Sequence, residues 1–473
     1  MKTRRLIHAD KDTFCEVFWD GTEAEVVSGA RGTKGRARRL DFETPMGCNR
    51  FVEEEVAKRI KQGFVEVMPE ALPIEQAVTA PRATASPQFL AEIAAAYDDD
   101  APRLVYADWL QSQGDPLGEL IVVQCERARL ERWDPKQRLL KDREDQLLIT
   151  FRRRWLPELD DDVAAEFRRG FVERVRIVNH RATTKLLDRV LAIAPLVRTL
   201  ELDGELALER VASAASLRAL TGLAIRGALR STSVERLMEM PELVGITRLA
   251  LRGCGLGRMA LKGLALRAWQ ELDLHQNTLG ANGTRLVLER VEPDALTALD
   301  IGSCGVGDDG VKLLAATPLP RLHTLNLRRS SLTRRALGAL AAAPGLTALR
   351  RIDLSMNGFH EAGPGLGAFC ESPKLGALCE LDLRNAMLGD AGLEVLARSQ
   401  LARRLVALDL GTNGITEQGA ALLATTPWPA LRYLNLSGNP IDKAAEALRS
   451  GLPGVRVVLR STTASAAAIV GDG

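Results

Sequence analysis

The segment LVALDLGTN at residues 405–413 is followed by LRYLNLSGN at residues 431–439, and both share one pattern. Leucine occupies the first, fourth and sixth positions of each segment, and asparagine occupies the ninth. An apolar pair of this kind recurs along the chain at steps of 27, 26, 27, 29, 27 and 26 residues. The pairs are Leu272/Leu274, Leu299/Ile301, Leu325/Leu327, Ile352/Leu354, Leu381/Leu383, Leu408/Leu410 and Leu434/Leu436. A fixed period of this size predicts stacked units, each of which buries its apolar face against its neighbours.

The pattern L-x-x-L-x-L-x-x-N resembles the leucine-rich repeat in its longer, ribonuclease-inhibitor-like form. The asparagine position is filled by Asn277, Asn357, Asn413 and Asn439, and in other units by Cys254, Cys304, Ser330 and Ala386. In that family this side chain bonds backbone groups where the chain leaves the strand, so the unit with Ala386 should be locally looser. The resemblance implies an α/β solenoid over residues 166–460, with parallel strands on the concave side and helices on the convex side. Weaker units precede it around Leu200, Leu223 and Leu249.

The first 67 residues predict a small α+β domain, with strands at residues 14–18 and 38–42 and a helix at residues 49–62. The segment VSGARGTKG at residues 27–35 is similar to the signature of WGR domains, which in some DNA-damage enzymes contact DNA. Ser28 and Ala30 stand where that family has tryptophan and arginine. The candidate phosphate contacts are Arg31, Lys34, Arg36 and Arg38. Acidic residues are also frequent in this domain, so a module that binds protein or nothing is the competing interpretation.

The segments LVYADWL at residues 104–110 and GDPLGE at residues 114–119 resemble a bacterial repeat-companion domain, which is found upstream of leucine-rich repeats. Asp98–Asp100 followed by Pro102 predicts a helix start, and this interpretation is favoured over a metal site. Because the end of a solenoid leaves an apolar face open, we expect this helical domain to be a cap. The domain map is residues 1–67 for the WGR-like domain, 68–87 for a proline-containing linker, 88–165 for the cap, 166–460 for the solenoid and 461–473 for a flexible tail.

The charge and the cysteines restrict the class of protein. The chain has 63 basic and 61 acidic residues, so no global field favours nucleic acid or an anionic membrane. The seven cysteines show no C-x-x-C spacing, which is typical of buried thiols in a reducing compartment. The basic start of the chain lacks the apolar segment of a signal peptide, and no apolar run is long enough to cross a bilayer. We therefore expect a cytoplasmic protein that is not bound to a membrane.

Motifs that carry chemistry are missing from the sequence. The five histidines include no pair at the spacing of a metal-binding helix, and His360–Glu361 lacks the second histidine of H-E-x-x-H. Neither a phosphate-binding G-K-[ST] loop nor a G-x-S-x-G elbow occurs. We expect a protein without a cofactor, a metal ion or a catalytic site.

The residue between the two apolar residues of each strand should point away from the core, because side chains alternate across a strand. Aspartates at this position form an acidic ladder, and side chains two positions before and after it should share the same face. Neighbouring strands lie about 4.8 Å apart, where two unit charges repel by about 0.9 kcal/mol in bulk water. The candidate partner-binding residues are Asp273, His275, Asp300, Arg328, Arg351, Asp353, Asp382, Arg384, Asp409 and Tyr433. A solvated ladder that binds nothing is the plainer interpretation.

The sequence favours a non-enzymatic scaffold or regulator that binds a protein partner on the concave face of the solenoid. One alternative is a protein that contacts DNA through its WGR-like domain while the repeats recruit an effector. Another is a regulatory subunit or inhibitor of a partner enzyme.

Overall fold

The computed structural model describes residues 2–8, 13–20, 22–30, 35–42, 44–62, 64–67, 87–134, 136–156, 163–178, 181–360, 364–441 and 443–459. The chain divides into two compact units, Met1–Pro157 and Glu158–Gly473. Apart from Pro87, the predicted linker at residues 68–87 lies outside the described residues, and so does the predicted tail at residues 461–473.

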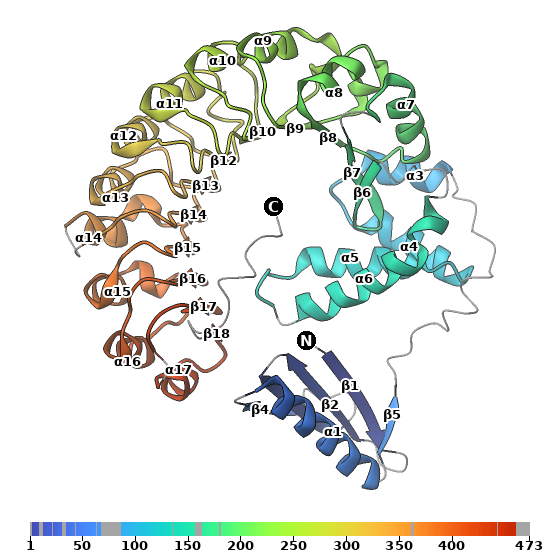
Figure 1. The fold of residues 1–473 in the computed structure, drawn as a ribbon, viewed down its shortest axis with the longest axis vertical. Helices are drawn as coiled ribbons and strands as arrows, with labels where there is room; N and C mark the ends of the chain where they lie inside the picture. The colour runs from blue at the N-terminus through green and yellow to red at the C-terminus, as the bar shows by residue number, and fades with distance from the viewer. Residues whose placement is uncertain are drawn as a thin grey trace. The chain divides into compact units, whose positions relative to one another are not determined.

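The first unit begins with a five-stranded antiparallel sheet that packs against one helix (Figure 1). In the order of the sheet, the strands are β4 (Arg36–Asp41), β3 (Glu23–Ala30), β2 (Thr13–Asp20), β1 (Lys2–His8) and β5 (Phe64–Val67). Alternate residues of β2 and β3, such as Val17 and Val26, join Val52 and Val56 of helix α1 (Pro45–Lys61) in one apolar core. The predicted strands and helix of this domain are confirmed, although α1 begins earlier, at Pro45.

The same unit continues with four helices: α3 (Pro87–Ala95), α4 (Ala101–Ser112), α5 (Leu117–Arg129) and α6 (Lys136–Trp155). Helix α4 starts directly after the aspartate triplet, and Oδ1 of Asp99 accepts a bond of 2.9 Å from the backbone N–H of Ala101. The predicted helix start is therefore confirmed, with its physical reason: the carboxylate satisfies an N–H group that has no partner within the helix. The role of these helices as a cap of the solenoid stays a prediction.

The second unit is a curved solenoid with a 13-stranded sheet on its inner side and helices on its outer side (Figure 1). The strands are β6 (Val163–Arg168), β7 (Phe171–Ile177), β8 (Thr199–Asp203), β9 (Gly222–Arg226), β10 (Arg248–Arg252), β11 (Glu271–Asp273), β12 (Ala298–Asp300), β13 (Thr324–Asn326), β14 (Arg351–Asp353), β15 (Glu380–Asp382), β16 (Ala407–Asp409), β17 (Tyr433–Asn435) and β18 (Arg456–Val458). The helices are α7 (Thr184–Ile193), α8 (Gly204–Val211), α9 (Ser231–Glu239), α10 (Arg258–Lys262), α11 (Gly280–Leu288), α12 (Gly307–Ala316), α13 (Arg334–Ala341), α14 (Pro364–Glu371), α15 (Gly389–Ala397), α16 (Glu417–Thr425) and α17 (Ala445–Gly451). The predicted α/β solenoid is confirmed.

The first pair of strands in the sheet departs from the parallel pattern of the repeats. From β7 onward all neighbours are parallel, but β6 and β7 form an antiparallel hairpin. Arg169 and Gly170 turn the chain between them with φ values of 47° and 87°, in the left-handed region that glycine adopts readily. An antiparallel hairpin therefore precedes the parallel strands of the repeats at this end of the sheet.

The predicted asparagine positions hold neighbouring repeats together. Nδ2 of Asn357 donates to the carbonyl groups of Leu327 and Leu354 at 2.9 Å each, and its Oδ1 accepts from the backbone N–H of Ser330 at 3.0 Å. Where cysteine replaces asparagine, the thiol makes the bond between repeats, as from Cys304 to the carbonyl of Leu274 at 3.0 Å. Ala386 has no side-chain donor, and the looser packing expected around it stays a prediction.

Candidate binding face

The inner surface of the sheet presents three columns of side chains, which we call the concave face. Strand pairing places the predicted ladder residues in register, so that Asp353 aligns with Asp382 and Asp382 with Asp409. The ladder column from β10 to β17 is Ala250, Asp273, Asp300, Asn326, Asp353, Asp382, Asp409 and Asn435. The first column, two residues earlier, is Arg248, Glu271, Ala298, Thr324, Arg351, Glu380, Ala407 and Tyr433. The third column, two residues later, is Arg252, His275, Gly302, Arg328, Ser355, Arg384, Gly411 and Ser437.

Each polar ladder side chain forms a hydrogen bond with the backbone at the point where its strand ends. Its Oδ1 accepts a bond from the backbone N–H two residues later, at 2.9–3.1 Å. This bond turns the chain out of the strand, as aspartate and asparagine commonly do. The ladder therefore has a structural role that an amide fulfils as well as a carboxylate, since Asn326 and Asn435 make the same bond.

Polar side chains on neighbouring strands contact the carboxylates of two ladder aspartates, Asp300 and Asp409. Nδ2 of Asn326 donates to Oδ2 of Asp300, and Nδ2 of Asn435 donates to Oδ2 of Asp409, both at 2.9 Å. Nδ1 of His275 lies 3.2 Å from Oδ1 of Asp300. These contacts link β11 with β12 and β13, and separately β16 with β17.

Among the stacked carboxylates of Asp353, Asp382 and Asp409, the middle one has a raised pKa. Burial, followed by the neighbouring charges of Asp353 and Asp409, raises the pKa of Asp382 from 3.8 to about 6. The backbone N–H and the guanidinium of Arg384 oppose this shift, and that guanidinium lies 3.4 Å from Oδ2 of Asp382. The Asp382 side chain is 22% exposed, so it is accessible to a partner although it is largely desolvated.

At the other end of the ladder, the pKa of Asp273 is also raised. Burial and the charge of Asp300 raise its pKa, while a direct bond from Nε of Arg252 lowers it. The side chains of Asp273 and His275 are 17% and 23% exposed. The acidic part of the concave face thus runs from β11 to β16, interrupted by the amide of Asn326.

The predicted arginine and tyrosine positions also lie on this face. Nε of Arg351 is 3.8 Å from a carboxylate oxygen of Glu380 on the next strand, and the Arg351 side chain is 44% exposed. Tyr433 is half-buried at the start of β17. Ser355 differs from the expectation for its column, because it is fully buried.

A group of charges on β7, β8 and β9 extends the concave face beyond the residues predicted from the sequence. Glu201 is 4% exposed, and its Oε1 lies 2.7 Å from Arg226 and 3.6 Å from Arg176. Arg176 also donates to both carboxylate oxygens of Asp203, at 2.9 and 3.0 Å. The repeats in this part of the chain have weaker sequence patterns, but the alternation of charged residues in TLELD at residues 199–203 could have indicated the group.

The basic residues predicted as phosphate contacts are placed only in part by the structure. Arg31 and Lys34 lie outside the described residues. Arg36 and Arg38 are exposed on the edge strand β4, where the guanidinium of Arg38 lies 5.9 Å from the ring centroid of Phe51. Beside them, Arg39 pairs with Glu25 at 2.8 Å. Their role as phosphate contacts stays a prediction.

The described cysteines are buried except for Cys379, which is partly exposed. Burial raises the pKa values of Cys254, Cys304 and Cys370 to about 12, which leaves almost no thiolate near neutral pH. Within the ranges that the structure describes, no three His, Cys, Asp or Glu side chains are arranged to hold a metal ion. The search for membrane-spanning helices, made over the same ranges, found none.

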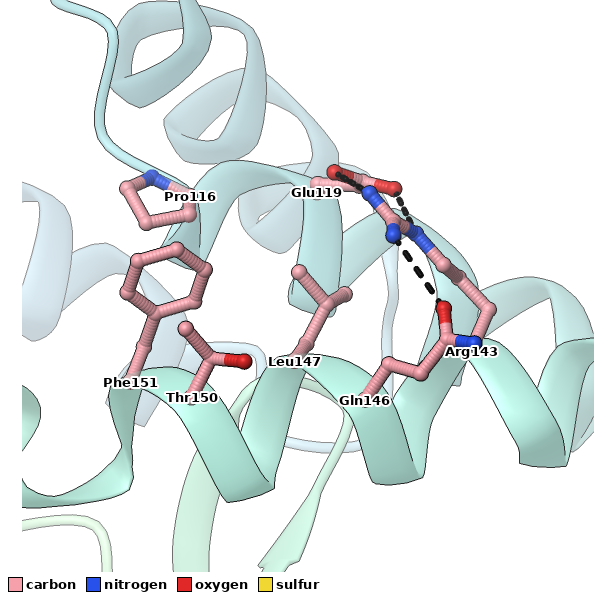
Figure 2. Close-up of a pocket in the computed structure, with 7 residues that line it drawn as sticks. All are labelled: Pro116, Glu119, Arg143, Gln146, Leu147, Thr150 and Phe151. Carbon is pink, nitrogen blue, oxygen red and sulfur yellow. Dashed lines mark hydrogen bonds and ion pairs between the residues drawn. The ribbon is translucent and has the colours of Figure 1, made fainter. Parts of the chain in front are cut away.

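A small hollow lies between helices α5 and α6 of the first unit (Figure 2). Its lining residues are Pro116, Glu119, Arg143, Gln146, Leu147, Thr150 and Phe151. Arg143 donates two bonds to the carboxylate of Glu119, at 2.5 and 2.7 Å, and so closes one end of the hollow. Arg143 and Glu119 neutralise each other, so this lining offers a ligand no unpaired charge. The hollow is therefore a poorer candidate site than the concave face.

Comparisons with known proteins agree with the repeat. Residues 296–315 match the family model described as Leucine Rich repeat. Among curated proteins, no sequence matches the chain. The repeat match and the observed solenoid together support a leucine-rich repeat protein.

Three solved structures illustrate the similarity. One is a protein from Bacteroides fragilis, with 13% identity, coverage of 98% of this chain and 97% of that chain, and a TM-score of 0.34. Another is the Rad7 and Elc1 complex in yeast, with 15% identity, coverage of 81% and 97%, and a TM-score of 0.44. The third is an internalin (inlF) from Listeria monocytogenes, with 15% identity, coverage of 60% and 86%, and a TM-score of 0.32.

Proposed function

We propose that the protein is a non-enzymatic, cytoplasmic scaffold or regulator that binds a protein partner through its concave face. The observation that carries the proposal is the ladder from Asp273 to Asp409, which places partly exposed aspartates in register on five of the six strands from β11 to β16. Such an extended surface suits a folded domain or an extended segment better than a small molecule, which prefers an enclosed pocket. The exposed arginines and Tyr433 supply residue types that often anchor protein interfaces.

The free thiols support the proposed compartment. All the cysteines of the chain are free, and all but Cys379 are buried. Thiols of this kind persist where glutathione keeps the interior of the cell reduced. The WGR-like domain would supply a second contact with the partner or with another protein.

The experiment that tests the proposal is a pull-down with the full chain from its native host, followed by mass spectrometry and by binding measurements on variants. The concave variant is Asp353→Asn, Asp382→Asn and Asp409→Asn together, because asparagine keeps the backbone bond that ends each strand. The control is Lys312→Gln with Glu394→Gln, both on convex helices. We expect the partner to lose affinity for the concave variant alone. A partner that binds both variants like the wild type, or that is lost only with the convex changes, would refute the assignment.

A further inference from the structure

Arg328 differs from the other arginines of the third column. From β9 to β15 these arginines are Arg226, Arg252, Arg328 and Arg384. Arg226 pairs with Glu201 at 2.7 Å, Arg252 with Asp273, and Arg384 with Asp382 at 3.4 Å. Among the residues that the structure describes, the guanidinium of Arg328 bonds only to Sδ of Met356, at 3.1 Å. A thioether is a weak acceptor and carries no charge, so this cation is not neutralised.

The strand that carries Arg328 explains why it has no acid. Strand β13 has Thr324 in the first column and Asn326 in the ladder column, so it contributes no carboxylate. The carboxylate of Asp300, on the strand before, already accepts from the backbone N–H of Gly302 and from Nδ2 of Asn326, at 2.9 Å each. The repeat of β13 therefore places one positive charge without a paired carboxylate on the concave face.

The neighbours of Arg328 in its column bring no carboxylate to it. Gly302 on one side has no side chain, and Ser355 on the other has a short one. In the described part of the chain, Oγ of Ser355 has no hydrogen-bond partner although the residue is fully buried. Buried hydroxyl groups are normally bonded, so this unbonded group is a second feature of the same place on the face.

The ladder column beyond Arg328 is acidic, and Arg351 and Arg384 lie in the columns on either side of it. Asp353, Asp382 and Asp409 follow on the next three strands, and their carboxylates stack in register. Two strand spacings separate β13 from β15, a distance of about 9.6 Å. An extended peptide in the polyproline II conformation rises about 3.1 Å per residue with about three residues per turn, so side chains about three positions apart lie about 9.3 Å apart on the same side.

We propose that Arg328 is the docking point for a carboxylate side chain of the partner, on an extended segment that carries a basic residue three positions away. The basic residue lies against Asp382, and the carboxylate forms a forked bond with the guanidinium of Arg328 in place of the contact with Met356. This inference rests on the proposed function of the concave face and specifies the chemistry of its partner.

The test is a selection from a displayed library of random 12-residue peptides on the full-length protein. We expect the selected peptides to share Asp or Glu three positions from Lys or Arg. Arg328→Gln should weaken their binding about tenfold or more, the effect of one charge-assisted bond. Arg328→Lys should keep part of the affinity, because it keeps the charge but loses the forked geometry. Arg335→Gln, on the convex helix of the same repeat, is the matched control and should leave binding unchanged.

The outcomes separate this inference from the proposed function. The role of Arg328 would be overturned if the selected peptides lack acidic residues, or if they bind the Arg328→Gln variant as tightly as the wild type but the Asp382→Asn variant more weakly. Either result would leave the concave face as the binding site. Peptides that bind all the concave variants like the wild type would overturn both. Melting curves of each variant show whether an effect on binding reflects loss of the fold.

Discussion

The replacement Asp382→Asn should make the solenoid more stable at neutral pH. Asp382 lies between Asp353 and Asp409 in the ladder, and its Oδ1 accepts from the backbone N–H of Arg384 at 2.9 Å. Asn326 and Asn435 show that an amide makes the same bond. Both also donate Nδ2 to the aspartate of the preceding strand, at 2.9 Å. Asparagine at position 382 should therefore keep the turn, remove a charge and donate to Asp353.

The expected magnitude follows from the pKa of Asp382. A rise from 3.8 to about 6 corresponds to about 3 kcal/mol of destabilisation once the group is ionised. Asparagine also loses the contact with Arg384, and the side chain is partly exposed, so we expect a gain of about 1–2 kcal/mol. Because the folded pKa lies above the unfolded one, ionisation weakens the folded state as the pH rises from about 4 to beyond 6. Below pH 4 both states of the wild type are protonated there, and the gain should vanish.

Urea unfolding at pH 4.5 and at pH 8 measures this difference. The midpoint of Asp382→Asn should exceed that of the wild type clearly at pH 8 and only slightly at pH 4.5, with little change in the slope. Glu394→Gln, on helix α15 of the same repeat, is the matched control, because that carboxylate is 49% exposed and pairs with Arg398. A loss of stability at pH 8, or an equal gain at both pH values, would refute the reasoning.

Three further predictions concern other parts of the molecule. Asn357→Ala should lower the free energy of unfolding by about 3 kcal/mol or more in urea titrations, because it leaves buried backbone groups of Ser330, Leu332 and Leu327 without partners; a change below about 1 kcal/mol would contradict this. Thiol titration of the native protein should detect Cys379 alone on a fast time scale, and all seven thiols only in denaturant; rapid reaction of several native thiols would show that the repeats open readily. The full chain should bind duplex DNA weakly and with a steep loss of affinity as salt rises, and Arg36→Ala with Arg38→Ala should weaken it further; tight binding that resists salt would favour the DNA-contacting alternative over the scaffold.

The register of the concave face was predictable because two periodicities act together. The repeat fixes one strand in each unit, and alternation within a strand fixes which side chains leave the core. The sequence therefore predicts that Asp353, Asp382 and Asp409 lie side by side, and the strand pairing confirms it. The asparagine positions are predictable for the same reason, since each unit repeats one backbone geometry.

Other features depend on contacts that no period encodes. The antiparallel hairpin of β6 and β7 arises at Arg169 and Gly170, outside the repeated pattern. Whether an arginine of the third column is neutralised depends on the reach of its side chain: Arg252 bonds to Asp273, but Arg328 turns to Met356. The burial of Ser355 likewise depends on its surroundings. Ser437 occupies the same column after β17, but it is partly exposed.

The ladder links stability and binding in a way that one substitution can reveal. Asn326 and Asn435 show that the turn after each strand does not need a carboxylate, so the charge of Asp382 adds an unfavourable interaction that the fold does not require. A cation of a partner placed against Asp382 would relieve that interaction, and the free energy released would add to the affinity. Asp382→Asn should therefore raise stability and lower affinity together. Loss of a structural residue lowers both, so opposite signs identify the acidic ladder as a binding surface.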